Sequence, residues 1–143
     1  MFSHPAWLCI DTVQFEKNLR AIRSRIGSCL FCLPVKADAY GHGLCPIAQI
    51  AEKTGIIDIL GISCLQEAIA LRKCGIRMPI LLFGALHEEQ IDQLLDLDVE
   101  LTISSKYKAS LVARHCAAKF KSCKVHIEVD TGMRRTGVRP ESV

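Results

Sequence analysis

The amino-acid sequence predicts an α/β fold in which a parallel sheet is covered by helices. Three observations support this prediction: the strand-like segments are almost continuously apolar, amphipathic helical segments alternate with them, and the connections are short. Strands that are buried on both faces lack the polar alternation of half-exposed strands, and their alternation with helices is typical of βαβ units. An open doubly wound sheet and a closed eight-stranded barrel both fit this pattern.

Short apolar segments predict the strands. In chain order they are Trp7 to Ile10, Cys29 to Val35, Ile56 to Cys64, Pro79 to Phe83, Val99 to Ile103 and Val125 to Val129. Leaving the first segment aside, five strands are each followed by a helix or a turn, whereas a closed barrel of this type needs eight strands and ~250 residues.

Between the strands, apolar residues recur at helical spacing and capping residues mark the ends. The predicted helices run from the cap at Asp11 or Thr12 to Gly27, from Leu44 to about Gly55, from Gln66 to Lys73, from near His87 to Leu97, and from the cap at Ser104 or Ser105 past Cys116. Gly27 and the Cys74-Gly75 pair stop the helices before them, as glycine commonly does.

Composition excludes several classes of protein. With 143 residues, 50% hydrophobic and 23% charged, the chain is long enough for one domain with a sizeable core. The net charge is +3 and the basic residues are scattered among acids, so we expect no nucleic-acid partner. The apolar runs are too short to span a membrane, and the start MFSHPAW does not resemble a signal peptide. We therefore expect a soluble, cytoplasmic protein without a membrane partner.

The chain contains eight cysteines. Cys29 and Cys32 form the CxxC pair, but strand alternation would place them on opposite faces, and no second pair or suitably spaced histidine completes a zinc set. We therefore expect reduced, buried, structural cysteines and no metal. A cysteine-based metal or redox protein is the alternative that these residues leave open.

The segment LPVKADAYGHG, Leu33 to Gly43, carries the strongest chemical signal. Lys36 follows a buried strand, where poor solvation favours the neutral amine that condenses with an aldehyde. Gly41 and Gly43 permit positive φ values and the close approach of a phosphate at a helix start. The pattern predicts a site for an aldehyde that carries a phosphate, and a solvated loop lysine is the alternative. Asp130 also follows a strand, at the end where α/β folds place active sites.

Three segments resemble the alanine racemase family, whose members are fold-type III enzymes that use pyridoxal 5'-phosphate. PVKADAYGHG resembles the family's cofactor-lysine motif, SCLQEAIALRKCGIRMPILLFG its third strand and helix with the next strand, and HIEVDTGMRRTGVRPES its DTGMxRxG segment. The resemblance implies that residues 1–143 are a truncated cofactor-binding domain, the N-terminal portion of a (β/α)8 TIM-type barrel with about five of its eight strands. It also implies a C-terminal β domain, which is absent here, and a homodimer in the intact enzyme.

The resemblance assigns roles to individual residues. Lys36 would bind the cofactor aldehyde covalently and then act as the base on one face of the substrate α-carbon. Tyr40 would contact the cofactor phosphate, and Arg135 the phenolic oxygen of the cofactor and the substrate carboxylate. Met133 would lie near the substrate. Glu128 stands where many members carry a carbamylated lysine, and we expect its carboxylate to pair with Arg135 directly.

The function implied is that of an alanine racemase, which interconverts L- and D-alanine for peptidoglycan precursors. The family's second base is a tyrosine from the partner subunit's C-terminal domain, and this chain has no counterpart. Tyr107 lies in a predicted surface helix and does not replace it. We therefore expect the isolated chain to be weakly active or inactive. The alternatives are a non-catalytic remnant that binds pyridoxal 5'-phosphate, or one half of a split racemase.

Overall fold

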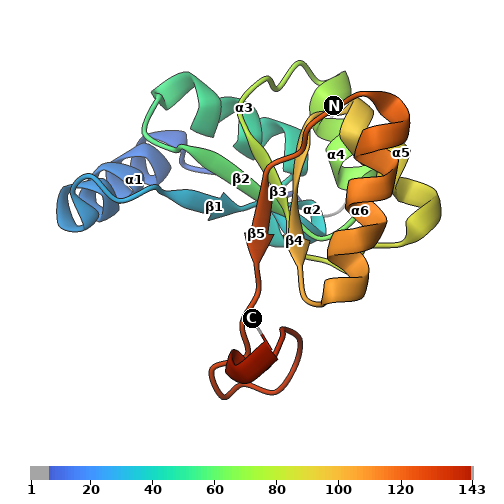
Figure 1. Ribbon diagram of the computed structural model, residues 1–143. Coiled ribbons are helices and arrows are strands. Elements are labelled where there is room, and N and C mark those ends of the chain that lie inside the picture. Colours follow the sequence, from blue (N-terminus) through green and yellow to red (C-terminus); the bar gives the residue numbers. More distant parts are fainter. Residues whose placement is uncertain (1–6, 143) are drawn as a thin grey trace.

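A five-stranded parallel sheet forms the centre of the protein (Figure 1). The structure is a computed structural model that describes residues 7–142. The strands lie in sequence order and are β1 (Cys32–Pro34), β2 (Ile59–Ile62), β3 (Ile80–Leu82), β4 (Val99–Ile103) and β5 (Val125–Ile127). The predicted α/β class, the parallel sheet and the five strands are confirmed. Four of these strands are shorter than predicted, because the ends of the apolar segments lie outside the strand pairing.

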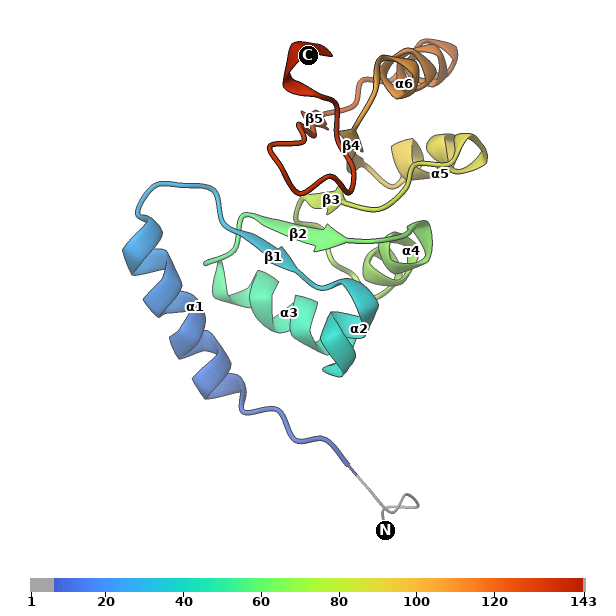
Figure 2. The same cartoon turned by 90° about the horizontal axis from the view of Figure 1, so that it is seen from below.

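Helices cover one face of the curved sheet, and the loop that follows β5 lies on the other side (Figure 2). The helical elements are α1 (Thr12–Ile26), α2 (Lys36–Gly41), α3 (Leu44–Thr54), α4 (Leu65–Lys73), η1 (Glu88–Gln90), α5 (Ile91–Asp96), α6 (Lys106–Lys119) and η2 (Pro140–Ser142). This arrangement follows from parallel pairing, because each crossover must return to the same end of the sheet. The carboxyl ends of all five strands therefore lie at the same end of the sheet, where the polar loops also lie.

Local capping contacts fix the helix ends as predicted. The Asp11 carboxylate accepts a hydrogen bond of 2.8 Å from Gln14 N at the start of α1. At the start of α6, Ser105 Oγ accepts one of 3.2 Å from Lys108 N. Gly27 ends α1 with φ +58°, a conformation that suits glycine. These contacts depend on neighbours in sequence, which explains why the sequence predicted them.

The core lies between the sheet and its helices. Every residue of β2 and β3 is buried, which confirms the prediction from uninterrupted apolar runs. Strand β4 alternates instead: Glu100 and Thr102 are only partly buried and share the face opposite the helices. Leu71 of α4 and Leu94 of α5 are fully buried against the sheet. At β4 the sheet thus has one buried face and one face that is partly polar.

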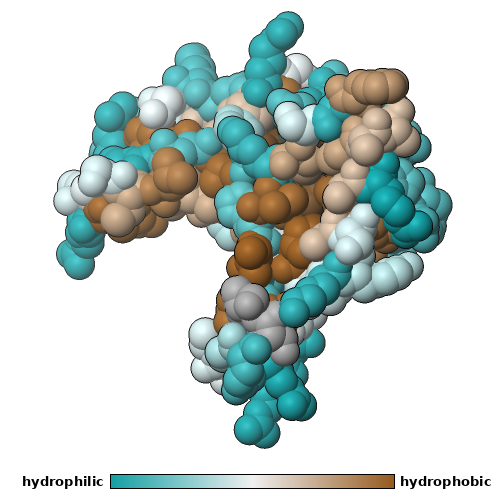
Figure 3. Space-filling model, viewed as in Figure 1, coloured by the Kyte–Doolittle hydropathy of each residue, from teal (hydrophilic) through white to brown (hydrophobic). Residues whose placement is uncertain are grey.

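Strand β5 is exposed along its whole length. Apolar side chains gather over it and the adjoining face of α6 (Figure 3), and they form a groove lined by residues that include Ile103, Val112, Cys116, Val125, Ile127 and Val138. Strands β1 and β5 each pair on one side only, with β2 and β4 respectively. The sheet is therefore open along these two edges.

The predicted first strand at Trp7 to Ile10 is wrong. These residues have no regular secondary structure, and the side chains of Trp7 and Leu8 are 72% and 63% exposed. A strand needs a neighbour that completes its hydrogen-bond ladder, and the open edge of β1 does not pair with this segment. No helix among residues 7–142 is long and apolar enough to cross a membrane.

The cysteines are less buried than predicted. All eight are free; Cys9 and Cys29 are exposed and the other six are partly buried. Cys29 lies before β1 rather than in it, so strand alternation does not separate it from Cys32. Among residues 7–142, no group of three or more His, Cys, Asp or Glu side chains is arranged to hold a metal ion.

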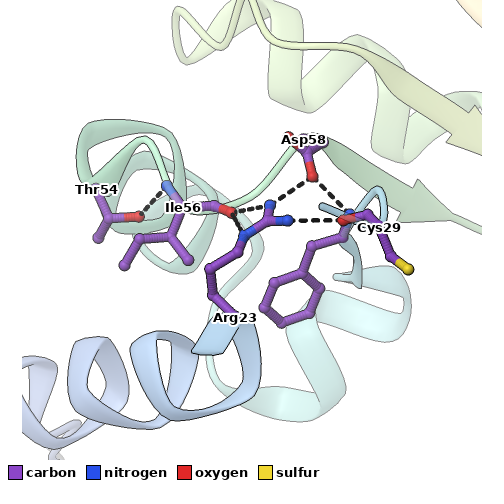
Figure 4. Close-up of polar contacts among 6 residues, drawn as sticks. Arg23, Cys29, Thr54, Ile56 and Asp58 are labelled. Carbon is purple, nitrogen blue, oxygen red and sulfur yellow. Dashed lines mark hydrogen bonds and ion pairs between the residues drawn. The ribbon is translucent and has the colours of Figure 1, made fainter. Parts of the chain in front are cut away.

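Arg23 connects α1 to the sheet (Figure 4). Its guanidinium donates to the carbonyl oxygens of Ile56 and Cys29, at 3.1 Å from Nε and 2.7 Å from Nη1, and forms an ion pair with Asp58. It also lies over the Phe31 ring, 5.5 Å from the centroid. The Asp58 carboxylate accepts a further hydrogen bond from Phe31 N. These contacts hold the end of α1 beside the segments that enter β1 and β2.

Candidate active site at the carboxyl ends of the strands

Lys36 lies directly beyond the carboxyl end of β1. The preceding residue, Val35, is fully buried, and its amide donates to the Gly61 carbonyl of β2 at 2.8 Å. Val35 therefore anchors the backbone from which Lys36 projects. The Lys36 side chain is partly buried, and its amine makes no hydrogen bond or ion pair with another residue in the described part of the chain. The amine is thus available to a ligand.

The chain turns after Lys36 through an unusual left-handed segment. Ala37, Asp38, Ala39 and Tyr40 have φ values of 51° to 56° and ψ values of 36° to 52°. The sequence predicted a turn directly after Lys36 and singled out Gly41 and Gly43 as residues that permit positive φ, but it did not indicate positive φ at these four non-glycine residues. Each non-glycine residue in this conformation costs roughly 1–2 kcal/mol. Contacts from elsewhere in the fold must therefore hold the turn.

Glu67 provides one of these contacts. Its carboxylate accepts hydrogen bonds from Ala37 N and Ser63 N, both at 2.7 Å, and from Ser63 Oγ at 3.1 Å. Glu67 belongs to the first turn of α4, where an acid interacts favourably with the helix dipole. One carboxylate thus joins the residue after Lys36 to the end of β2. No motif in the sequence singled out Glu67, although an acid early in a helix is a usable signal.

Asp38 provides the second contact, at the helix start where the sequence predicts a phosphate. Its carboxylate accepts a hydrogen bond of 2.6 Å from Leu44 N, the first amide of α3. A carboxylate therefore accepts the first amide of the helix start where we expected a phosphate. Gly41 and Gly43 do have positive φ, at 85° and 93°. The Tyr40 side chain is 60% exposed, and its hydroxyl has no partner among the described residues.

Two glycines bring the ends of β2 and β3 close together beside Lys36. A Cβ on Gly84 would lie 1.8 Å from the Ser63 carbonyl oxygen, and a Cβ on Gly61 would lie 2.2 Å from the Phe83 ring. Any larger residue at Gly84 must displace backbone. Phe83 lies at the carboxyl end of β3 and remains 40% exposed. It offers an apolar surface next to the polar turn.

The loop after β5 carries the second set of predicted residues. The amides of Arg134 and Gly132 donate to the Asp130 carboxylate, at 2.9 and 3.0 Å, and hold the pKa of Asp130 below its usual range. Main-chain hydrogen bonds between this segment and Val138 close the loop. Asp130 therefore organises the backbone of the loop, as N–H-accepting aspartates commonly do.

Glu128 does not pair with Arg135 in this structure. It accepts a hydrogen bond from the Thr136 hydroxyl instead, and no ion pair joins it to Arg135 within residues 7–142. Thr136 is nearer to the Glu128 carboxylate because the loop folds back onto the end of β5. Arg135 and Met133 are exposed, Met133 to 80%. The Arg135 guanidinium is unpartnered among the described residues.

The predicted residues fall into two groups at the same end of the sheet. Lys36 and Tyr40 follow β1, whereas Glu128, Met133 and Arg135 lie at and beyond the end of β5, in the loop seen below the sheet in Figure 1. Strands β1 and β5 are the two edge strands of the sheet. Four strand spacings of ~4.8 Å place them about 19 Å apart along the sheet, and the curvature of the sheet shortens the straight-line distance. The described residues thus show two half-sites that are not in contact.

Comparisons with known proteins identify the family. The family model described as "Alanine racemase, N-terminal domain" matches residues 10–143. The chain belongs to the alanine racemase family. An alanine racemase of Desulfovibrio desulfuricans is 40% identical over 141 residues, which are 98% of this chain and 38% of the relative. The chain therefore spans little more than a third of the length of the curated alanine racemases it matches.

Solved structures resolve the choice of architecture. An alanine racemase of Clostridium difficile superposes with a TM-score of 0.87 at 29% identity, over 98% of this chain and 37% of that one. The five parallel strands are the N-terminal portion of a TIM-type barrel, not a doubly wound sheet. A histidine racemase from Leuconostoc mesenteroides superposes with a TM-score of 0.81 at 26% identity, over 90% of this chain and 34% of that one. This part of the alanine racemase fold thus occurs in racemases with different named substrates.

Proposed function

We propose that the protein is a pyridoxal 5'-phosphate-dependent racemase that interconverts L- and D-alanine, and that it supplies D-alanine for peptidoglycan. The observation that carries the proposal is the free amine of Lys36, which follows β1 on a turn held by Glu67. Membership of the alanine racemase family supports the reaction class. The curated relatives named alanine racemase support the choice of substrate.

The residues present fit this cofactor. An amine suits the aldehyde, a tyrosine hydroxyl suits a phosphate oxygen, and a guanidinium suits a phenolate or carboxylate. The structure holds all three groups, on Lys36, Tyr40 and Arg135, and each is without a protein partner among the described residues. Unpartnered polar groups at the carboxyl ends of parallel strands are typical of a ligand site.

The mechanism divides the work between cofactor and protein. When bound, the cofactor supplies an electron sink for the bond that breaks at the substrate α-carbon. Lys36 would first hold the aldehyde and then remove or return the α-proton on one face. Arg135 would orient the substrate carboxylate, and Met133 would border the substrate. Glu128 would act on Arg135 only after a rearrangement that exchanges its Thr136 contact.

Racemisation also needs a proton-transfer group on the opposite face of the α-carbon. Tyr107 is 66% exposed in the first turn of α6, and within residues 7–142 no hydrogen bond or ion pair connects it with the Lys36 turn. We propose that the second base comes from a partner subunit in a homodimer of the intact enzyme. The isolated 143-residue chain should therefore racemise alanine very slowly.

Borohydride trapping tests the cofactor site directly. The protein is incubated with pyridoxal 5'-phosphate and reduced, and the modified lysine is located by peptide mapping. We expect the label on Lys36, and its loss in Lys36→Arg. Lys108→Arg is a matched control, because Lys108 is also a partly buried lysine near the carboxyl end of a strand. Labelling that is unchanged in Lys36→Arg would refute the assignment.

Activity measurements separate the racemase from its alternatives. A racemisation rate with L-alanine that matches intact relatives would contradict the requirement for a second base. A protein that carries the label and gains racemisation only when a C-terminal region of a relative is added would behave as one half of a split racemase. A protein that carries the label and never racemises would be a binding remnant. L-Histidine as a second substrate tests the choice of alanine.

A further inference from the structure

Cys45 and Cys74 come together where α3 packs beside α4 (Figure 2). Cys45 lies in the first turn of α3, and Cys74 is the residue directly after α4. The Cys45 thiol donates to the Ala70 carbonyl at 3.7 Å, and the amide of Cys74 donates to the same carbonyl at 2.9 Å. The Cys74 thiol donates to the Leu71 carbonyl at 3.3 Å. Two cysteines from different helices thus share one turn of α4.

The surroundings of the pair leave the thiols within reach of a small oxidant and keep them protonated. Both cysteines are partly buried, so a small oxidant can reach them while larger partners are hindered. Burial and the neighbouring Cys45 thiol raise the pKa of the Cys74 thiol to about 11. Neither cysteine belongs to the candidate active site. The pair therefore has no role in the function proposed above.

We propose that Cys45 and Cys74 are a redox pair that closes to a disulfide between α3 and α4 when a small-molecule disulfide oxidises it. One cysteine thiolate attacks the small disulfide and releases the first small thiolate. The second cysteine thiolate then attacks the mixed disulfide and releases the second. The two cysteines lose two electrons, the small disulfide gains them, and the two cysteine protons end on the two released thiols.

The pH dependence of closure follows from the thiolate requirement. Thiolates, not thiols, attack disulfides. Because Cys74 is mostly protonated near neutral pH, the step in which it attacks should accelerate about tenfold per pH unit below its pKa. The disulfide would lock α3 to α4, the helices that carry the Leu44 amide and the Glu67 carboxylate beside the Lys36 turn.

Peptide mapping tests the proposal without ambiguity. Trypsin should release residues 37–53, with Cys45 as their single cysteine, and residues 74–77, with Cys74 as theirs. The purified protein is incubated with glutathione disulfide at mildly alkaline pH, alkylated, digested without reductant and analysed by mass spectrometry. We expect most of the two peptides to be recovered as one disulfide-linked pair, and we expect this pair to disappear after reduction. Residues 26–36 hold both Cys29 and Cys32 and report oxidation elsewhere.

Either of two results would overturn the proposal. The first is complete alkylation of both cysteines under conditions that oxidise Cys29 and Cys32. The second is a stable glutathione adduct on Cys45 or Cys74 without the cross-link. Cys45→Ser should abolish the cross-link, whereas Cys116→Ser, on α6, should leave it unchanged. Oxidation should also raise the urea midpoint of the unsubstituted protein but not that of Cys45→Ser, and equal shifts in both would contradict the assignment.

Discussion

Replacing Arg23 with methionine should loosen α1 from the sheet. Leu19 is the fully buried residue of this helix, so the guanidinium contributes much of the attachment. The substitution leaves the Ile56 carbonyl without its donor, breaks the ion pair with Asp58 and removes the contact with the Phe31 ring. Methionine keeps the helix propensity and most of the apolar stem. The expected loss therefore comes from the polar contacts.

The size of the expected loss in unfolding free energy depends on how far each contact is exposed to solvent. Arg23 is 28% exposed and Asp58 38%, so water screens their ion pair and limits it to about 1 kcal/mol. An unsatisfied carbonyl at the buried Ile56 costs about 1 kcal/mol more, and the ring contact about 0.5 kcal/mol. We expect a decrease of about 2.5 kcal/mol in the free energy of unfolding, and about 8 °C in Tm for a chain of this size.

Urea unfolding followed by circular dichroism measures this loss. Arg20→Met is the matched control, because Arg20 lies one turn earlier on the same helix and pairs with Glu16 at the surface. That exposed i,i+4 pair is worth about 0.5 kcal/mol or less. Equal losses for the two variants would refute the argument that Arg23 anchors α1. The double variant Arg23→Met/Asp58→Asn should lose less free energy of unfolding than the sum of the losses in the two single variants, because each substitution removes the same ion pair.

Three further predictions concern pH, packing and the site. Hydrogen bonds from Arg23 and the Phe31 amide lower the pKa of Asp58, so its stabilisation is present above the ordinary aspartate pKa and is lost as pH falls through the lower folded value. In Asp58→Asn, the free energy of unfolding should fall less steeply as the pH is lowered through the acid range. An unchanged fall in this variant would contradict the prediction. Gly84→Ala should cost about 3 kcal/mol because a Cβ would meet a carbonyl oxygen at 1.8 Å, whereas Gly55→Ala, with open space and φ +63°, should cost about 1 kcal/mol. Glu67→Gln should weaken pyridoxal 5'-phosphate binding about tenfold, since a neutral amide holds the Lys36 turn less firmly. Glu52→Gln is its control, because Glu52 also accepts two backbone amides, but far from the turn; equal effects on cofactor binding would refute a specific role for Glu67.

The helices were predictable because their signals are local. Asp11 and Ser105 cap amides three residues away, and Gly27 ends α1 through its own conformational freedom. The apolar runs likewise predicted five parallel strands. The expected burial on both faces holds for β2 and β3, whereas β4 alternates and β5 is exposed. The same reasoning failed for Trp7 to Ile10, where the composition suits a strand but no neighbouring strand pairs with it. A strand exists only when its ladder is completed elsewhere.

Lys36 shows both what local sequence signals determine and what contacts between distant segments determine. The sequence by itself determined that a lysine follows a buried strand within a family-specific motif, because both features are contiguous in the chain. Only the tertiary structure decided that the next four residues turn left-handed, because Glu67, 30 residues away, holds Ala37 N in place. It also decided that Asp38 accepts the first amide of α3 and that Glu128 accepts a hydrogen bond from Thr136. Folding brings together backbone amides from distant segments, and one carboxylate can accept hydrogen bonds from several of them. Such contacts outweigh the local conformational preference of the residues in the turn.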